Sequence, residues 1–114
     1  MDTSIKEENF MPKMISTGTG RTTCAFFLPG DTSIVYGSTH LADINCPVVP
    51  GRGPNGAYVW PIYDGYDIFK ANLKGEIIDT LTNEPGYDAE ATLSPDGKSI
   101  VFTSMRTGDL ELFI

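Results

Sequence analysis

The chain has 114 residues, and its 40% hydrophobic content with 11% aromatics suits one ordinary domain with a real core. Its formal net charge of −7 opposes binding to phosphate backbones and anionic membrane surfaces, so we expect no nucleic-acid partner. No apolar run approaches the roughly 20 residues that span a bilayer, and the acidic, polar start MDTSIKEENF does not fit a secretory signal, so we expect no membrane insertion and no signal peptide in this chain.

The first ten residues show no strand alternation. Ser4 and Glu7 have the spacing of a helix capping box, but a stretch of this length without a buried face favours a mobile tail. We therefore predict a tail over residues 1–10.

From residue 11 onward, short β-rich runs alternate with turn signals. The clearest turn is Ser94-Pro95-Asp96-Gly97, where Pro95 fixes φ and Gly97 can take a positive φ. Runs spaced in this way predict an all-β chain of antiparallel meanders. The predicted strands are Met11–Ser16, Thr23–Leu28, Ser33–Ser38, Tyr66–Ala71, Ile77–Thr82, Asp88–Leu93, Ser99–Thr103 and Leu110–Ile114.

The sequence repeats internally. A shift of 66 residues aligns Met14–Ser38 with Thr80–Ser104 without a gap, and a shift of 44 lays Tyr66–Phe69 over Leu110–Phe113. The unit is therefore about 44 residues long, and the first copy carries a 22-residue insertion. A period in the forties with four strands per unit is typical of a β-propeller. Since each blade of a propeller covers the next, we expect both middle strands, Ser33–Ser38 and Ser99–Thr103, to be apolar on both faces.

The second copy resembles the TolB-like β-propeller repeat. The resemblance rests on SPDG at Ser94–Gly97, IVFTS at Ile100–Ser104, the R-x-G-D turn at Arg106–Asp109 and LELF at Leu110–Phe113. It covers residues 11–114 and implies propeller blades of four-stranded antiparallel meanders, about two blades per chain. Blade 1 would span about residues 22–82 with the insertion at 40–62, and blade 2 about residues 88–114 without its last strand.

In function, the resemblance implies a non-catalytic binding or interaction scaffold, either a TolB-like propeller fragment or a small self-assembling propeller. It also implies a periplasmic or secreted location if the chain is part of an exported parent. The alternative is a propeller enzyme acting on acidic oligosaccharides through metal-bound histidine, or a propeller domain accessory to a peptidase. We expect no enzyme activity and no cofactor, because His40 is the only histidine.

The insertion, Thr39–Gly65, has four prolines and the only tryptophan of the chain. It should lie beside Gly18–Thr22 on one rim, and it is long for a loop without a function. We expect it to be ordered, with Trp60 or Tyr63 packed on that rim. The rim is the predicted ligand site, formed by His40, Trp60, Tyr63 and Asp64, and the ligand would be another protein or a carbohydrate. The alternative is that the aromatic residues only anchor the loop.

Two other interpretations concern the same rim. His40, Asp43 and Cys46 are spaced H-x2-D-x2-C, but they are three different donor types without a fourth ligand, so we predict no metal site. Cys24 and Cys46 should both emerge there, close enough for a disulfide, with two buried free thiols as the alternative. Acidic residues near the rim could attract a cation or simply be solvated, namely Asp64, Asp67, Asp88 and Glu90.

Two blades with open edges predict self-association. In a head-to-tail pair, Met11–Ser16 of one chain would lie beside Leu110–Ile114 of the next and complete a four-stranded blade. Three or four copies would close a ring of six or eight blades, within the usual propeller range of about four to eight. The alternative is an isologous dimer that exchanges the same strands. The predicted partner is therefore the chain itself.

Overall fold

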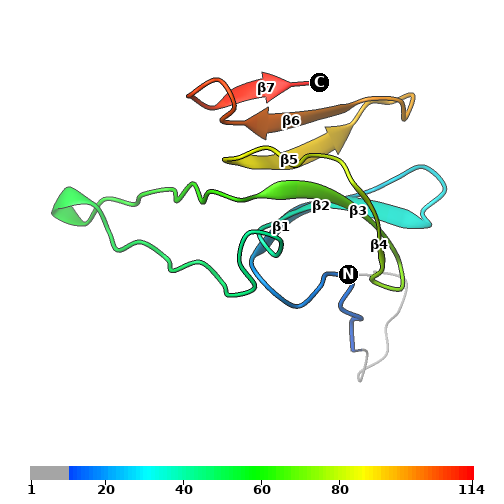
Figure 1. The fold of residues 1–114 in the computed structure, drawn as a ribbon, viewed down its shortest axis with the longest axis horizontal. Helices are drawn as coiled ribbons and strands as arrows, with labels where there is room; N and C mark the ends of the chain where they lie inside the picture. The colour runs from blue at the N-terminus through cyan, green and yellow to red at the C-terminus, as the bar shows by residue number, and fades with distance from the viewer. Residues whose placement is uncertain (1–10) are drawn as a thin grey trace.

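Two antiparallel sheets account for all seven strands of the computed structural model, which describes residues 11–114 (Figure 1). The predicted tail at residues 1–10 lies outside the described residues. The first sheet has the order β1-β2-β3-β4, formed by Thr22–Phe27, Ser33–Ser38, Asp67–Asn72 and Ile77–Thr80. The second has the order β5-β6-β7, formed by Asp88–Leu93, Ile100–Ser104 and Glu111–Phe113. The all-β prediction is confirmed, and residues 11–114 form no closed ring.

Helical structure in the described chain is limited to one 3-10 turn, η1, at Pro54–Gly56. Between residues 11 and 114, no helix has the length and apolar character needed to cross a membrane.

Both sheets pair their strands in the same register. In the first sheet, β1 pairs with β2 through Thr22 with Ser38 and Phe27 with Ile34. Four residue pairs join β1 to β2. Adding 66 to both residue numbers of each pair gives the four pairs that join β5 to β6. The β2–β3 pair of Tyr36 with Phe69 likewise becomes the β6–β7 pair of Phe102 with Phe113, with offsets of 66 and 44. The two offsets found in the sequence are therefore present in the backbone pairing.

The first strand of each sheet carries the same local distortion. Pairing is interrupted between Thr23 and Phe26 in β1 and at the equivalent place in β5. Within each interruption one non-glycine residue has a positive φ, 46° at Cys24 and 61° at Glu90. A bulge that recurs at the same place in two copies is a built feature of the strand, because it turns the bulged residue out of the ladder.

One face of the first sheet packs against the second sheet, with β5 lying next to β2 and β3 (Figure 1). Val35 and Ile68 of the first sheet meet Ala91 and Phe102 of the second, and all four side chains are buried. Gly37 allows the close approach, since a Cβ at this position would lie 3.4 Å from the Cβ of Ala89. The partly buried residues Leu28, Ile100 and Phe113 extend this core.

The other faces of the two sheets differ in how they are covered. On the first sheet, a second buried cluster contains Ile34, Tyr36, Phe69 and Ala71, and Ile15 packs against it. All six residues of β2 are buried, as predicted for a strand covered on both faces. On the second sheet, alternation turns Val101 and Leu112 away from the core, and Leu112 is 74% exposed. Only one face of β6 is covered within the chain, which agrees with the open apolar face expected of two blades.

Met11–Ser16 is not a strand, so that prediction is wrong. The segment lies over the face of the first sheet, where Ile15 contacts the buried cluster and the Lys13 ammonium donates to the Leu73 carbonyl at 3.2 Å. A segment that crosses a sheet face has no ladder partner for its backbone. Ile15 is therefore partly buried without a strand, while Met11 and Met14 are 85% and 66% exposed. The predicted strands Ile77–Thr82 and Leu110–Ile114 are shorter than expected, at Ile77–Thr80 and Glu111–Phe113.

Candidate binding site

The insertion starts directly on the rim formed by Gly18–Thr22, as predicted. The Gly20 amide donates to the Ile44 carbonyl at 2.8 Å, and Arg21 and Thr39 exchange two further hydrogen bonds of 2.9 and 3.0 Å. Gly20 has a φ of +66°, and a Cβ there would come within 2.8 Å of the His40 Cα. Only glycine therefore lets the start of the insertion lie this close to the rim.

Beyond the rim, the insertion extends away from the sheets as a long loop with η1 at its far end (Figure 1). Two extended arms, residues 47–52 and 58–63, run to and from this turn. The Gly53 amide donates to the Ala57 carbonyl at 2.9 Å, and Arg52 Nη1 donates to the Gly56 carbonyl at 3.0 Å. These contacts close the tip, so the separation of the two arms is set at both ends.

A groove of about 390 Å³ lies between the arms and the rim. Its lining contains no acidic residue of the described chain, although the chain as a whole is acidic. Two arginines and several aromatic rings dominate it, with valine and proline between them. The side chains used below are Arg21, Arg52, Tyr58, Trp60, Tyr63 and Tyr66.

The base of the groove is built from packed aromatic rings. Tyr66 and Tyr87 are both buried and meet edge to face, with 5.4 Å between ring centroids. Tyr63 packs beside them, and the Arg21 guanidinium lies 5.1 Å from its ring centroid, a cation–π distance. Burial raises the pKa of Tyr66, and the charge of Arg21 opposes this rise. The Tyr63 ring thus holds Arg21 over the base of the groove.

The outer wall of the groove is more open. Tyr58 and Trp60 are 74% and 67% exposed, and their rings meet edge to face at 6.4 Å. This leaves aromatic surface uncovered at the mouth. The predicted packing of the insertion is thus provided by Tyr63, while Trp60 faces solvent.

His40 and Asp64, the other two predicted site residues, do not line the groove. The His40 ring lies on Phe69 with centroids 4.4 Å apart, and its Nδ1 is 2.9 Å from Ser38 Oγ. Burial lowers the pKa of His40. Asp64 is exposed. The structure therefore brings together Trp60 and Tyr63 from the predicted set.

The two cysteines are free and exposed. Cys24 Sγ lies 3.2 Å from Thr23 Oγ1. The Asp43 carboxylate accepts hydrogen bonds from the backbone and side chain of Asn45, at 2.8 and 2.9 Å. Among residues 11–114, no group of three possible metal ligands gathers. A Cys24–Cys46 bridge is not formed in this structure and stays a prediction. The alternative of two buried thiols is wrong, because both cysteines are exposed.

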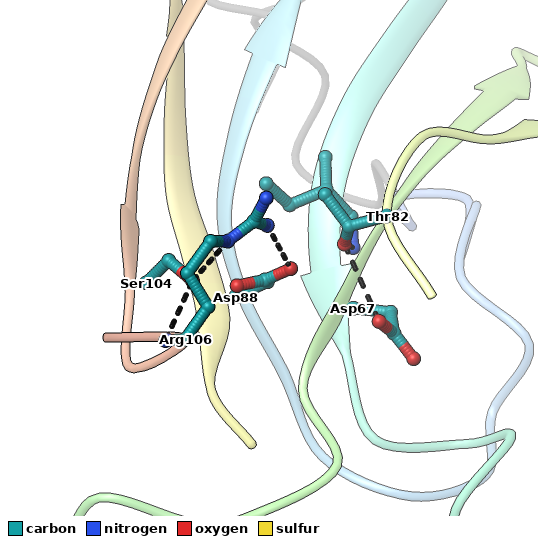
Figure 2. A network of polar contacts seen from close by, with 6 residues as sticks. Asp67, Thr82, Asp88, Ser104 and Arg106 are labelled. Carbon is teal, nitrogen blue, oxygen red and sulfur yellow. Dashed lines mark hydrogen bonds and ion pairs between the residues drawn. The ribbon is translucent and has the colours of Figure 1, made fainter. Parts of the chain in front are cut away.

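In the other predicted cluster, Asp67 and Asp88 are engaged within the protein (Figure 2). Asp88 is buried and accepts from Arg106 Nη2 at 2.9 Å, while Arg106 Nε donates to Ser104 Oγ at the same distance. Asp67 is buried and accepts from Thr82 Oγ1 at 3.3 Å, and burial raises its pKa. Internal partners therefore take up both carboxylates.

The groove residues that the sequence analysis missed include Arg21, Arg52 and Tyr58. A signal was present, because two of the three arginines of the chain lie in the insertion or in the rim next to it. Comparison of the chain with protein-family models, curated proteins and solved structures finds no match.

Proposed function

We propose that this chain is a TolB-like two-blade unit that associates head to tail with further copies and acts as a non-catalytic binding scaffold. The observation that carries this proposal is the shared register of the two sheets, because it relates every residue of one interface to an equivalent residue of another. On the family resemblance alone, we also propose an exported location.

The contact between the two sheets within the chain supplies the geometry for a contact between chains. Within the chain, Val35 and Ile68 pack on Ile100 and Phe102. By the repeat offsets, Val35 and Ile68 are equivalent to Val101 and Leu112. These two residues lie on the open face of the second sheet, which is the face turned away from the first sheet. The residues equivalent to Ile100 and Phe102 are Ile34 and Tyr36. They lie on the far face of the first sheet, which is the face turned away from the second sheet. The open face of one copy therefore matches the far face of the next.

A hollow of about 350 Å³ on the far face supports this match. Its lining includes Ala25, Ile34 and Tyr36. Their equivalents in the second sheet are Ala91, Ile100 and Phe102, which within the chain are covered by the first sheet. The hollow is thus the place into which Val101 and Leu112 of a second copy would fit.

The position of the N-terminal segment supports this assembly. Ser16 is equivalent to Thr82, whose hydroxyl accepts a hydrogen bond from the Ile68 amide at 2.9 Å. The equivalent of Ile68 in the second sheet is Leu112. Ser16 of one copy would therefore receive the Leu112 amide of the next, and Met11–Ser16 would gain its strand partner in β7.

One position breaks the equivalence. Thr103 stands where the first sheet has Gly37, and its hydroxyl donates to Glu90 Oε2 at 2.9 Å. A second copy must lie slightly further out at this end, because a threonine side chain fills the space above the backbone that Gly37 leaves to Ala89 within the chain.

Leu112→Lys tests the proposed contact. Leu112 is 74% exposed, so the substitution should leave the fold of the free chain intact. In the assembly it would bury an ammonium without a partner, which should weaken association at least ~10-fold. Val48→Lys introduces a lysine at an exposed valine of the insertion, 88% exposed, and serves as the control. Sedimentation velocity that shows equal association for both variants would refute the proposed contact.

A further inference from the structure

We propose that the groove between the arms of the insertion binds an extended peptide segment in which a carboxylate lies next to an aromatic or proline side chain. This inference deepens the binding role proposed above and rests on it, but it does not require self-association. It is carried by three properties of the groove, namely its charge, its exposed rings and its unpaired backbone.

Charge selects an anionic ligand. The chain has a net charge of −7, yet the groove contains two of its three arginines and no acid of the described residues. The one ion pair formed within residues 11–114 joins Arg106 to Asp88, so neither Arg21 nor Arg52 has a carboxylate partner there. Both side chains are nevertheless held in place, Arg21 by the Tyr63 ring and Arg52 by the Gly56 carbonyl. Planar guanidinium groups positioned in this way suit carboxylates, which can accept two parallel hydrogen bonds.

The exposed rings of the groove favour a ligand that carries an aromatic or proline side chain next to its carboxylate. Trp60 and Tyr58 together present aromatic surface at the mouth of the groove, flanked by Val49, Val59 and Pro61. Rings that are two-thirds or more exposed in the free chain lose that exposure when a ligand side chain stacks on them. Large exposed aromatic residues beside arginine are the residue types enriched at protein-binding surfaces.

The backbone of the two arms favours a peptide over a sugar or a nucleotide. Residues 47–52 and 58–63 run as two elongated arms (Figure 1). Pro47, Pro50 and Pro61 have no N–H, and the other amides of the arms donate to no backbone group of the described chain. An extended peptide can pair with such an arm through its own amides and carbonyls, as in strand addition. The buried Tyr63 hydroxyl, which has no partner among residues 11–114, offers one more polar group at the base. A polynucleotide is disfavoured by the net charge.

The probe is a fluorescein-labelled hexapeptide of alternating aspartate and phenylalanine, followed by anisotropy. Matched peptides carry asparagine for each aspartate or alanine for each phenylalanine. We expect the parent peptide to bind and each matched peptide to bind ~10-fold or more weakly, since one charge-assisted hydrogen bond or one ring contact has about that effect. Higher salt should weaken the parent peptide. The unlabelled peptide should also shift the fluorescence of Trp60, the only tryptophan.

Variants locate the site. Arg52→Gln and Trp60→Ala should each weaken binding ~10-fold, whereas Lys74→Gln, which removes an exposed charge on the turn after β3, should change it less than about two-fold. Circular dichroism checks that every variant is folded. The proposal is overturned if the acidic and asparagine peptides bind equally, if Arg52→Gln behaves like Lys74→Gln, or if no peptide binds at about 1 mM. Displacement of the label by glucuronate or adenosine monophosphate at lower concentration than by unlabelled peptide would also overturn it.

Discussion

The His40 ring and the Arg106 guanidinium occupy equivalent positions in the two sheets. Each follows by two residues the serine that ends the middle strand, and the backbone amide of each donates to that serine at 3.3 Å. Each also lies on the phenylalanine of the next strand, His40 on Phe69 at 4.4 Å and Arg106 on Phe113 at 4.9 Å. The difference is in charge, because only Arg106 has an acidic partner, the buried Asp88.

Arg106→Ala should lower the free energy of unfolding by ~2 kcal/mol, because it leaves the 3% exposed Asp88 carboxylate without its partner. The Arg106 side chain is 33% exposed, so the loss should be smaller than for a fully buried pair. His40→Ala removes the equivalent side chain without leaving a buried charge and should cost about half as much. Urea titrations of both variants measure this difference. Equal losses would mean that the ion pair adds nothing to the shared packing.

Stability should depend on pH through His40, the only histidine. Burial lowers its pKa in the folded chain below the value of 6.5, so the folded state favours the neutral ring. Between the lowered pKa and 6.5 the unfolded chain binds more protons, and stability therefore rises with pH across this window. The contribution is fully present above about pH 6.5 and is lost as the pH falls through the folded pKa. Urea midpoints over this range should show the slope in the parent chain but not in His40→Asn. A slope that persists in the variant would assign the effect to another group.

Glycine substitutions at the two positive-φ residues of the recurring bulge should have opposite effects on stability. Cys24→Gly should raise the free energy of unfolding by ~1 kcal/mol, because glycine adopts a φ of 46° without the steric cost paid by cysteine. Glu90→Gly relieves the same strain but removes hydrogen bonds to Tyr87 and Thr103, of 3.2 and 2.9 Å, and should be destabilising. Thermal unfolding of the two variants compares them directly. If Cys24→Gly is destabilising, the positive φ at Cys24 carries no strain.

Much of the fold could be predicted from the sequence because its signals are local. The turn at Ser94–Gly97 and the offsets of 66 and 44 predicted which strands pair and how. Met11–Ser16 could not be placed, because its apolar residues are compatible both with a strand and with the face-covering segment that it forms. The choice depends on whether an open strand edge lies within reach, and residue pattern alone does not contain that information.

The candidate site was less predictable than the fold. Proline and aromatic content predicted an ordered insertion with a ligand site, and two of the four predicted residues, Trp60 and Tyr63, line the groove. The participation of Arg21 and Arg52 depends on the path of a long loop, which brings residues 31 positions apart to one groove. His40 was expected on the rim because it begins the insertion, but the ring turns back onto Phe69. Side-chain direction at a strand end is set by packing, which the spacing of residues does not determine.

The mass of the chain in solution tests the proposed assembly most directly. Light scattering at micromolar concentration should give three or four times the chain mass of 12.4 kDa, as expected for a ring of six or eight blades closed by head-to-tail contacts. Twice that mass would exclude the ring and leave strand exchange between two copies. A monodisperse species of 12.4 kDa would contradict self-association in every form.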